Sequence, residues 1–163
     1  MFSIFKRKVA REVVVDDFVG SLVKVKESLK VITRQYDVTD STLSVFVGYI
    51  ALMAINECKV ERAEFDRIVS VFSILWCAKM NSDVNDELYD DIADRQYPKY
   101  TDTLKNGKGK DSLSSVIICF LELSKINPLQ VPEILGTLYV VVHGYVKELH
   151  NFLDTTYRKC KVV

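Results

Sequence analysis

The sequence has few of the residues that mark most metal-binding, catalytic and secreted proteins. Its 163 residues include two histidines, three prolines and six glycines. It contains no GxxxxGK[ST], GxGxxG, HExxH or GxSxG string, so nucleotide-binding loops, zinc proteases and serine hydrolases are not indicated. No motif points directly to an enzyme, and the function must be sought in how common residues are placed.

The chain also lacks an excess of charge of either sign. Its 22 Lys and Arg residues balance its 22 Asp and Glu residues. The basic residues at 1–11 and 105–110 are separate and sparse, whereas a nucleic-acid-binding surface carries a continuous basic patch. We therefore expect no direct nucleic-acid binding, and any electrostatic recognition must come from uneven placement of charge.

Disulfide and zinc frameworks are not indicated by the cysteines. The four cysteines, Cys58, Cys77, Cys119 and Cys160, are widely spaced along the chain. Two of them, Cys77 and Cys119, stand in strongly apolar stretches. Free, mostly buried thiols are typical of a reducing compartment, so we expect a cytoplasmic protein.

Long apolar runs are missing too. The longest uncharged run, residues 41–56, has 16 residues, whereas a membrane-spanning helix needs about 20. At the N-terminus three apolar residues (Phe2, Ile4 and Phe5) precede the basic residues 6–8, the reverse of a signal peptide. Residues 1–8 either fold back onto the protein, which is our preferred interpretation, or attach it peripherally to an anionic membrane.

What the sequence does contain is apolar residues at helical spacing. One stripe runs from Phe18 to Tyr36 with steps of four and three residues, and similar stripes follow. The patterns predict helices over 15–36, 41–55, 62–80, 83–97, 98–105, 113–126 and 132–152. We therefore expect one all-α domain over residues 1–163, a compact bundle of six or seven helices, with 1–12 as a candidate mobile tip.

Two single residues refine this expectation. The helix over 41–55 is apolar on all sides, which is typical of a central helix, and Gly48 within it would let a neighbouring helix approach closely. Pro98 should end or kink the helix that begins at residue 83, because proline lacks the N–H that continues the hydrogen-bond pattern.

An acidic segment is the strongest surface feature. Six carboxylates lie within residues 83–94, with no basic residue among them. They are Asp83, Asp86, Glu87, Asp90, Asp91 and Asp94. Tyr89, Tyr97 and Tyr100 lie in or beside this segment, and aromatic residues are frequent at protein interfaces. One interpretation is a solvated helix face. The other, which we prefer, is a non-enzymatic interaction module that docks a basic protein partner, as a small inhibitor or immunity-type protein would.

Carboxylate spacing suggests an enzymatic alternative. Glu61-x-x-Glu64 and Glu87-x-x-Asp90 would each project a carboxylate pair from one helix face. Two such pairs on adjacent helices can hold Mg²⁺ with a nucleotide phosphate. This pattern resembles the ExxE…ExxD signature of the all-α nucleoside triphosphate pyrophosphatases of the MazG kind. The resemblance implies Mg²⁺ as a cofactor and these four residues as its ligands.

The two histidines do not indicate a metal centre. His143 and His150 are seven residues apart and lie on one side of the last predicted helix, with Lys147 and Asp154. No Cys or Glu stands at a recognised zinc-ligand spacing from them. We expect the histidines to flank the core, and the preferred interpretation of the chain involves no cofactor.

Overall fold

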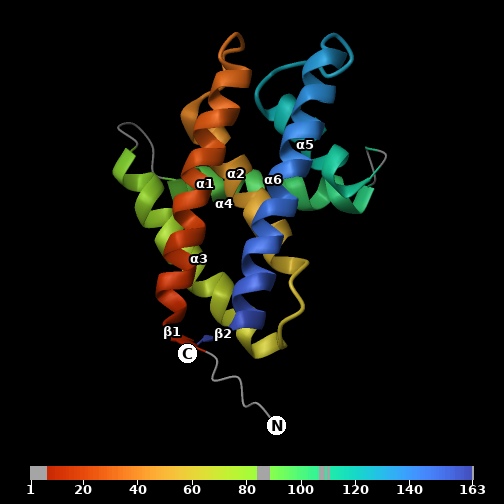
Figure 1. Ribbon diagram of the computed structural model, residues 1–163. Helices are drawn as coiled ribbons and strands as arrows, with labels where there is room; N and C mark the ends of the chain where they lie inside the picture. Colours follow the sequence, from red (N-terminus) through yellow and green to blue (C-terminus); the bar gives the residue numbers. More distant parts are fainter. Residues whose placement is uncertain (1–6, 84–88, 107–108, 110, 163) are drawn as a thin grey trace.

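The computed structural model describes residues 7–83, 89–106, 109 and 111–162 (Figure 1). Within them the chain forms six helices and two short strands, so the predicted all-α class is confirmed. The elements are β1 (Arg7–Val9), α1 (Arg11–Thr33), α2 (Asp40–Asn56), α3 (Arg62–Asp83), α4 (Tyr89–Asn106), α5 (Ser112–Leu123), α6 (Pro132–Lys159) and β2 (Cys160–Val162).

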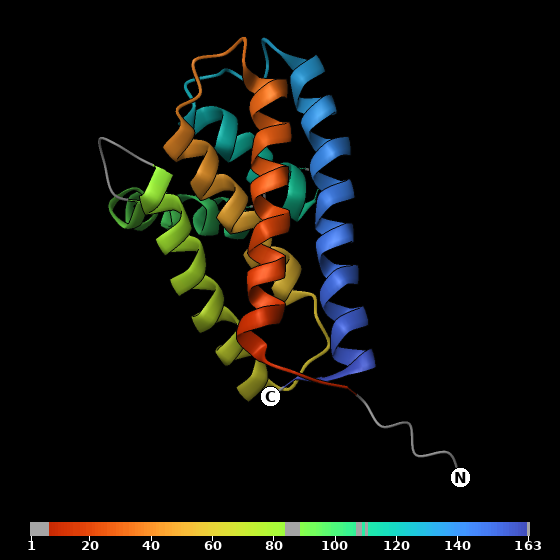
Figure 2. The same ribbon diagram turned by 60° about the vertical axis from the view of Figure 1, so that its left-hand side comes forward.

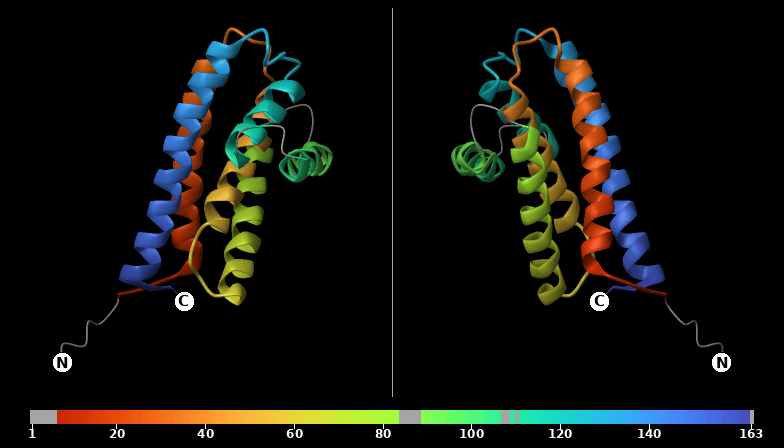
Figure 3. Two further views of the ribbon diagram at one scale, coloured as in Figure 1. Left: turned by 90° about the vertical axis from the view of Figure 1, so that its right-hand side faces the viewer. Right: turned by 90° about the vertical axis from the view of Figure 1, so that its left-hand side faces the viewer.

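The helices form layers. α1 and α6 lie side by side on one face of the molecule, α2 and α3 lie behind them, and α4 and α5 occupy the opposite face (Figures 2 and 3). α4 runs across the direction of α1, α3 and α6 rather than along it (Figure 3). Among the described residues, no helix has the combination of length and apolar character needed to cross a membrane.

The two strands were not predicted. β1 and β2 pair in parallel, with Arg7 opposite Cys160 and Val9 opposite Val162. Because β1 leads into α1 and β2 follows α6, this pairing fixes the adjoining ends of α1 and α6 to each other. Of the expected mobile tip, residues 7–9 form β1 and residues 11 and 12 begin α1, while residues 1–6 lie outside the described part of the chain.

The predicted boundaries of α4 were wrong at both ends. Residue 83 ends α3 instead of starting the next helix, and α4 continues through Pro98 to Asn106 as one helix. Tyr89 and Ile92 before the proline and Tyr100 after it are all buried in the same core. Pro98 therefore does not end the helix, because burial of residues on both sides of it offsets the helix-breaking cost of about 3 kcal/mol for an internal proline.

Aromatic rings connect all six helices through the core. Each ring contacts the next in a series that starts on α6, crosses α1 and α3, alternates between α4 and α2, and ends on α5. The series is Phe152, Phe18, Phe72, Trp76, Tyr89, Tyr97, Tyr49, Tyr100, Phe46 and Phe120. Tyr89 and Tyr97 meet through their hydroxyl groups, and the other neighbours meet ring to ring.

The role expected for Gly48 is confirmed. A Cβ atom at this position would lie 2.6 Å from the hydroxyl oxygens of Tyr89 and Tyr97 and 2.7 Å from Nε1 of Trp76. The absence of a side chain therefore lets α3 and α4 approach the centre of α2. α2 itself begins at Asp40, one residue before the predicted start, and Thr39 Oγ1 caps it by accepting a hydrogen bond from the N–H of Thr42.

Candidate functional site

Part of the predicted acidic segment forms an exposed surface at the start of α4. Asp90 and Asp91 lie in its first turn, and Asp94 follows one turn later. All three are exposed, and Asp91 and Asp94 make no ion pair with any residue that the structure describes. We call these three residues the acidic surface. Of the other predicted acids, Asp83 ends α3, and Asp86 and Glu87 lie outside the described residues.

The predicted tyrosines do not share this surface. Tyr89 is 5% exposed, Tyr100 is fully buried and Tyr97 is half-buried, so a surface role is wrong for Tyr89 and Tyr100. Burial raises the pKa of Tyr89 to about 12, so its hydroxyl stays protonated and shares a hydrogen bond with Tyr97. The tyrosines anchor α4 to the core, with the carboxylates on its outer side.

Hydrogen bonds fix the start of α4 to the end of α3. The Cys77 thiol donates to Asp90 Oδ1 at 2.8 Å, and Asn81 Nδ2 donates to Cys77 Sγ at 3.3 Å. Asn81 Oδ1 accepts from the Tyr89 backbone N–H at 2.6 Å. Burial and the Asp90 carboxylate raise the pKa of Cys77 to about 11, so the thiol remains a donor at neutral pH. The acidic surface therefore stands on a well-anchored helix end.

The structure does not bring the proposed magnesium ligands together. Glu61 directly precedes α3, and Glu64 lies in its first turn, where both of its oxygens accept from Arg11, at 2.8 and 2.9 Å. Asp90 contacts Cys77, thirteen residues further along α3, which is about 20 Å away at 1.5 Å per residue. Glu87 lies outside the described residues. The spacing argument failed because Asp90 lies at the start of α4, which meets α3 near Cys77 and not near its first turn.

Glu64 has a structural role at the end of the bundle. Besides pairing with Arg11 of α1, its Oε1 accepts a hydrogen bond from the Tyr157 hydroxyl of α6 at 3.2 Å. The hydrogen bonds from Arg11 lower the pKa of Glu64 below its ordinary value of 4.5. The carboxylate thus joins α1, α3 and α6. In the part of the chain that the structure describes, no three His, Cys, Asp or Glu side chains are grouped to hold a metal.

This role predicts a pH-dependent loss of stability. A carboxyl group whose pKa is lower in the folded state contributes stability above pH 4.5, and the contribution disappears as the pH falls through the folded-state pKa. We expect Glu64→Gln to lower the free energy of unfolding by about 1–2 kcal/mol at pH 7, and by progressively less as the pH is lowered below 4.5. Urea unfolding at pH 7 and at a series of pH values below 4.5 measures this.

The matched control is Asp66→Asn, two residues along the same helix. Asp66 is exposed and pairs with Arg62 at 3.2 Å, so its change should cost about 0.5 kcal/mol or less. If both variants lose the same stability at pH 7, or if the Glu64→Gln deficit does not shrink as the pH is lowered below 4.5, the assignment is wrong.

The histidines line a cavity of about 370 Å³ between α6, the end of α2 and the start of α5. His143, Lys147 and His150 face it from α6, as the helical spacing predicted, while Glu57 and Asp111 face it from the other elements. Both Asp111 oxygens are engaged, by the Ser114 N–H and by the Tyr139 hydroxyl. The cavity is therefore lined by side chains of both charge signs, and its two aspartate oxygens are already hydrogen-bonded.

A cysteine lies close to one of these histidines. Cys58 Sγ is 3.8 Å from His150 Nδ1, and it also donates to the Ala54 carbonyl oxygen at 3.4 Å. Burial, together with the charges of Asp154 and Glu57, raises the pKa of Cys58 to about 11. A nucleophilic cysteine needs a thiolate near neutral pH, whereas these surroundings favour the neutral thiol.

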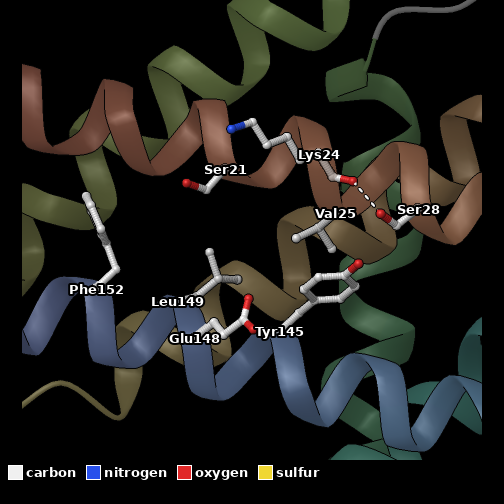
Figure 4. A pocket seen from close by; sticks show the side chains of 8 residues that line it. All are labelled: Ser21, Lys24, Val25, Ser28, Tyr145, Glu148, Leu149 and Phe152. Carbon is white, nitrogen blue, oxygen red and sulfur yellow. Dashed lines mark hydrogen bonds between the residues drawn. The ribbon is translucent and has the colours of Figure 1, made fainter.

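A surface groove that was not predicted lies between α1 and α6. It has a volume of about 260 Å³ and is lined at helical spacing by four residues of each helix, as Figure 4 shows. They are Ser21, Lys24, Val25, Ser28, Tyr145, Glu148, Leu149 and Phe152. The sequence shows which residues flank each apolar stripe, but nothing in it indicates that α1 and α6, at the two ends of the chain, are neighbours.

Comparison with protein-family models, with curated proteins and with solved structures finds no match to this chain.

Proposed function

We propose that this protein is a non-enzymatic interaction module of the cytoplasm, and that its acidic surface docks a basic protein partner. The observation that carries the proposal is the exposure of Asp91 and Asp94 without ion-pair partners among the described residues, on a helix end that is anchored from behind. Carboxylates held in this way contribute electrostatic attraction at little entropic cost on binding.

The arrangement fits a particular kind of partner. Three carboxylates within two helical turns match a cluster of Lys or Arg side chains, such as the cationic site of a protein that handles nucleic acid. Covering such a site is how a small inhibitor or immunity-type protein acts. The magnesium-dependent alternative is not supported by the placement of Glu64 and Asp90.

Charge reversal tests the proposal. A tagged chain should capture a basic protein from an extract of the cells that make it, and the Asp91→Lys/Asp94→Lys variant should lose that protein. The captured protein is then purified and its binding is measured with purified components. Reversing the basic side chains of its contact surface should restore binding to the Asp91→Lys/Asp94→Lys variant.

The matched control is Glu12→Lys/Asp16→Lys, which reverses two exposed acids in the first two turns of α1. It changes the net charge by the same amount and should leave binding intact. If the Asp91→Lys/Asp94→Lys variant still binds the partner, the acidic surface is not the docking site. The same conclusion holds if this variant and the Glu12→Lys/Asp16→Lys control lose binding equally.

A further inference from the structure

The groove between α1 and α6 lies on the face opposite α4, and the proposed function makes no use of it. No described element covers the outer side of this helix pair (Figures 2 and 3). Val25 and Leu149 are buried at the base of the groove, and Tyr145 and Phe152 extend across it from α6 toward α1 (Figure 4). Partly buried aromatic side chains over an apolar base are the usual centre of a protein interface.

Two opposite charges stand on the two sides of this groove. Lys24 projects from α1 and Glu148 from α6, and both are exposed. Their charged groups lie at about the same level along the groove (Figure 4), yet neither makes an ion pair with any residue in the described ranges. Each therefore presents an unpaired charge to whatever covers the groove.

The positions of these charges are self-complementary under one two-fold rotation. A half-turn about an axis along the groove places α1 of one copy over α6 of the other. Lys24 then faces Glu148 of the partner subunit, and the reciprocal contact forms as well. A half-turn about an axis across the groove, at the level of these charges, instead places Lys24 against the same lysine of the second copy, which is repulsive.

We infer that the groove binds a second copy of this chain, with the two-fold axis along the groove. The available surface is large enough. α1 has 23 residues and is about 35 Å long, and two adjacent helices are about 20 Å wide. The face thus offers about 700 Å² per subunit, close to the roughly 800 Å² of a standard stable interface.

The arrangement leaves the acidic surface free. Because α4 lies on the opposite side of the molecule from α1 and α6 (Figure 3), a dimer displays two acidic surfaces facing away from each other. Such a dimer would bind two copies of a basic partner, or two sites on an oligomeric one.

Charge exchange tests the inference, with light scattering after gel filtration as the measurement. The wild-type chain should have twice the monomer mass of 18.6 kDa. Lys24→Glu and Glu148→Lys should each weaken dimerisation roughly tenfold or more, because each places two like-charged pairs in the interface. Mixing the two single variants, or combining both changes in one chain, should restore the dimer, since opposite charges then face each other again.

Lys147→Glu is the matched control, because Lys147 is exposed on α6 but faces the histidine cavity. It should remain dimeric, and circular dichroism checks that every variant is folded. A wild-type chain that stays monomeric at about 100 µM, a concentration above the dissociation constant of a standard-size interface, overturns the inference. So does a dimer that neither single change weakens, or one that mixing does not restore.

Discussion

Asp40→Ala is expected to lower the free energy of unfolding by about 3 kcal/mol. Asp40 begins α2, and its Oδ2 accepts from Lys26 Nζ at 2.6 Å. The Lys26 side chain is only 5% exposed, and Met80 Sδ is its other polar neighbour, at 3.8 Å. Removing the carboxylate leaves an ammonium group buried without a counter-charge, which costs more than the pair itself contributed.

Two further variants separate this explanation from a general effect at the start of α2. Lys30 also contacts Asp40, at 3.0 Å, but its side chain is 57% exposed, so Lys30→Ala should cost about 0.5 kcal/mol. Lys26→Met removes the buried charge, so Lys26→Met/Asp40→Ala should recover most of the loss, to within about 1 kcal/mol of wild type. Urea unfolding measures all four proteins. A double variant no more stable than Asp40→Ala would refute the explanation.

Gly48→Ala should lower the free energy of unfolding by about 2 kcal/mol through overpacking, although alanine is the better helix former by about 1 kcal/mol. The new methyl group would come within 2.7 Å of atoms of Trp76, Tyr89 and Tyr97. Trp76 is 1% exposed and Tyr89 is 5% exposed, so neither ring has room to move aside. Relieving the clash would also disturb the hydrogen bond between the two tyrosine hydroxyls.

Gly136→Ala provides the matched control on α6. Gly136 is exposed, and nothing lies within 4 Å of the added Cβ. The same chemical change should therefore stabilise the protein by about 0.5–1 kcal/mol through helix propensity. Circular dichroism at 222 nm during urea unfolding gives both values. Two variants that shift stability in the same direction would contradict the packing described around Gly48.

The sequence predicted the fold well where the pattern was local. The central position of α2 and the close approach at Gly48 both follow from the residues of that helix alone. Local patterns failed at Pro98, where burial of Tyr89 and Tyr100 on both sides of the proline keeps one helix continuous. They also missed β1 and β2, because three-residue strands at opposite ends of the chain depend on a long-range contact.

The candidate site was likewise predictable only where it depends on a local pattern of residues. The carboxylates of α4 were identified because charge on a helix surface is visible in the sequence. The adjoining tyrosines were misplaced because an aromatic residue beside acids suits an interface or a core equally well. Glu64 was interpreted as a metal ligand because its partners, Arg11 and Tyr157, are 53 and 93 residues away.

The affinity of the captured partner for a neutralised acidic surface tests the central claim most directly. Asp91→Asn/Asp94→Asn keeps the size of both side chains and removes only their charge. We predict a dissociation constant roughly tenfold higher than that of the wild type at low ionic strength, with a smaller difference at high salt. Equal dissociation constants for the two proteins at low ionic strength would contradict the proposal that this protein acts through its acidic surface.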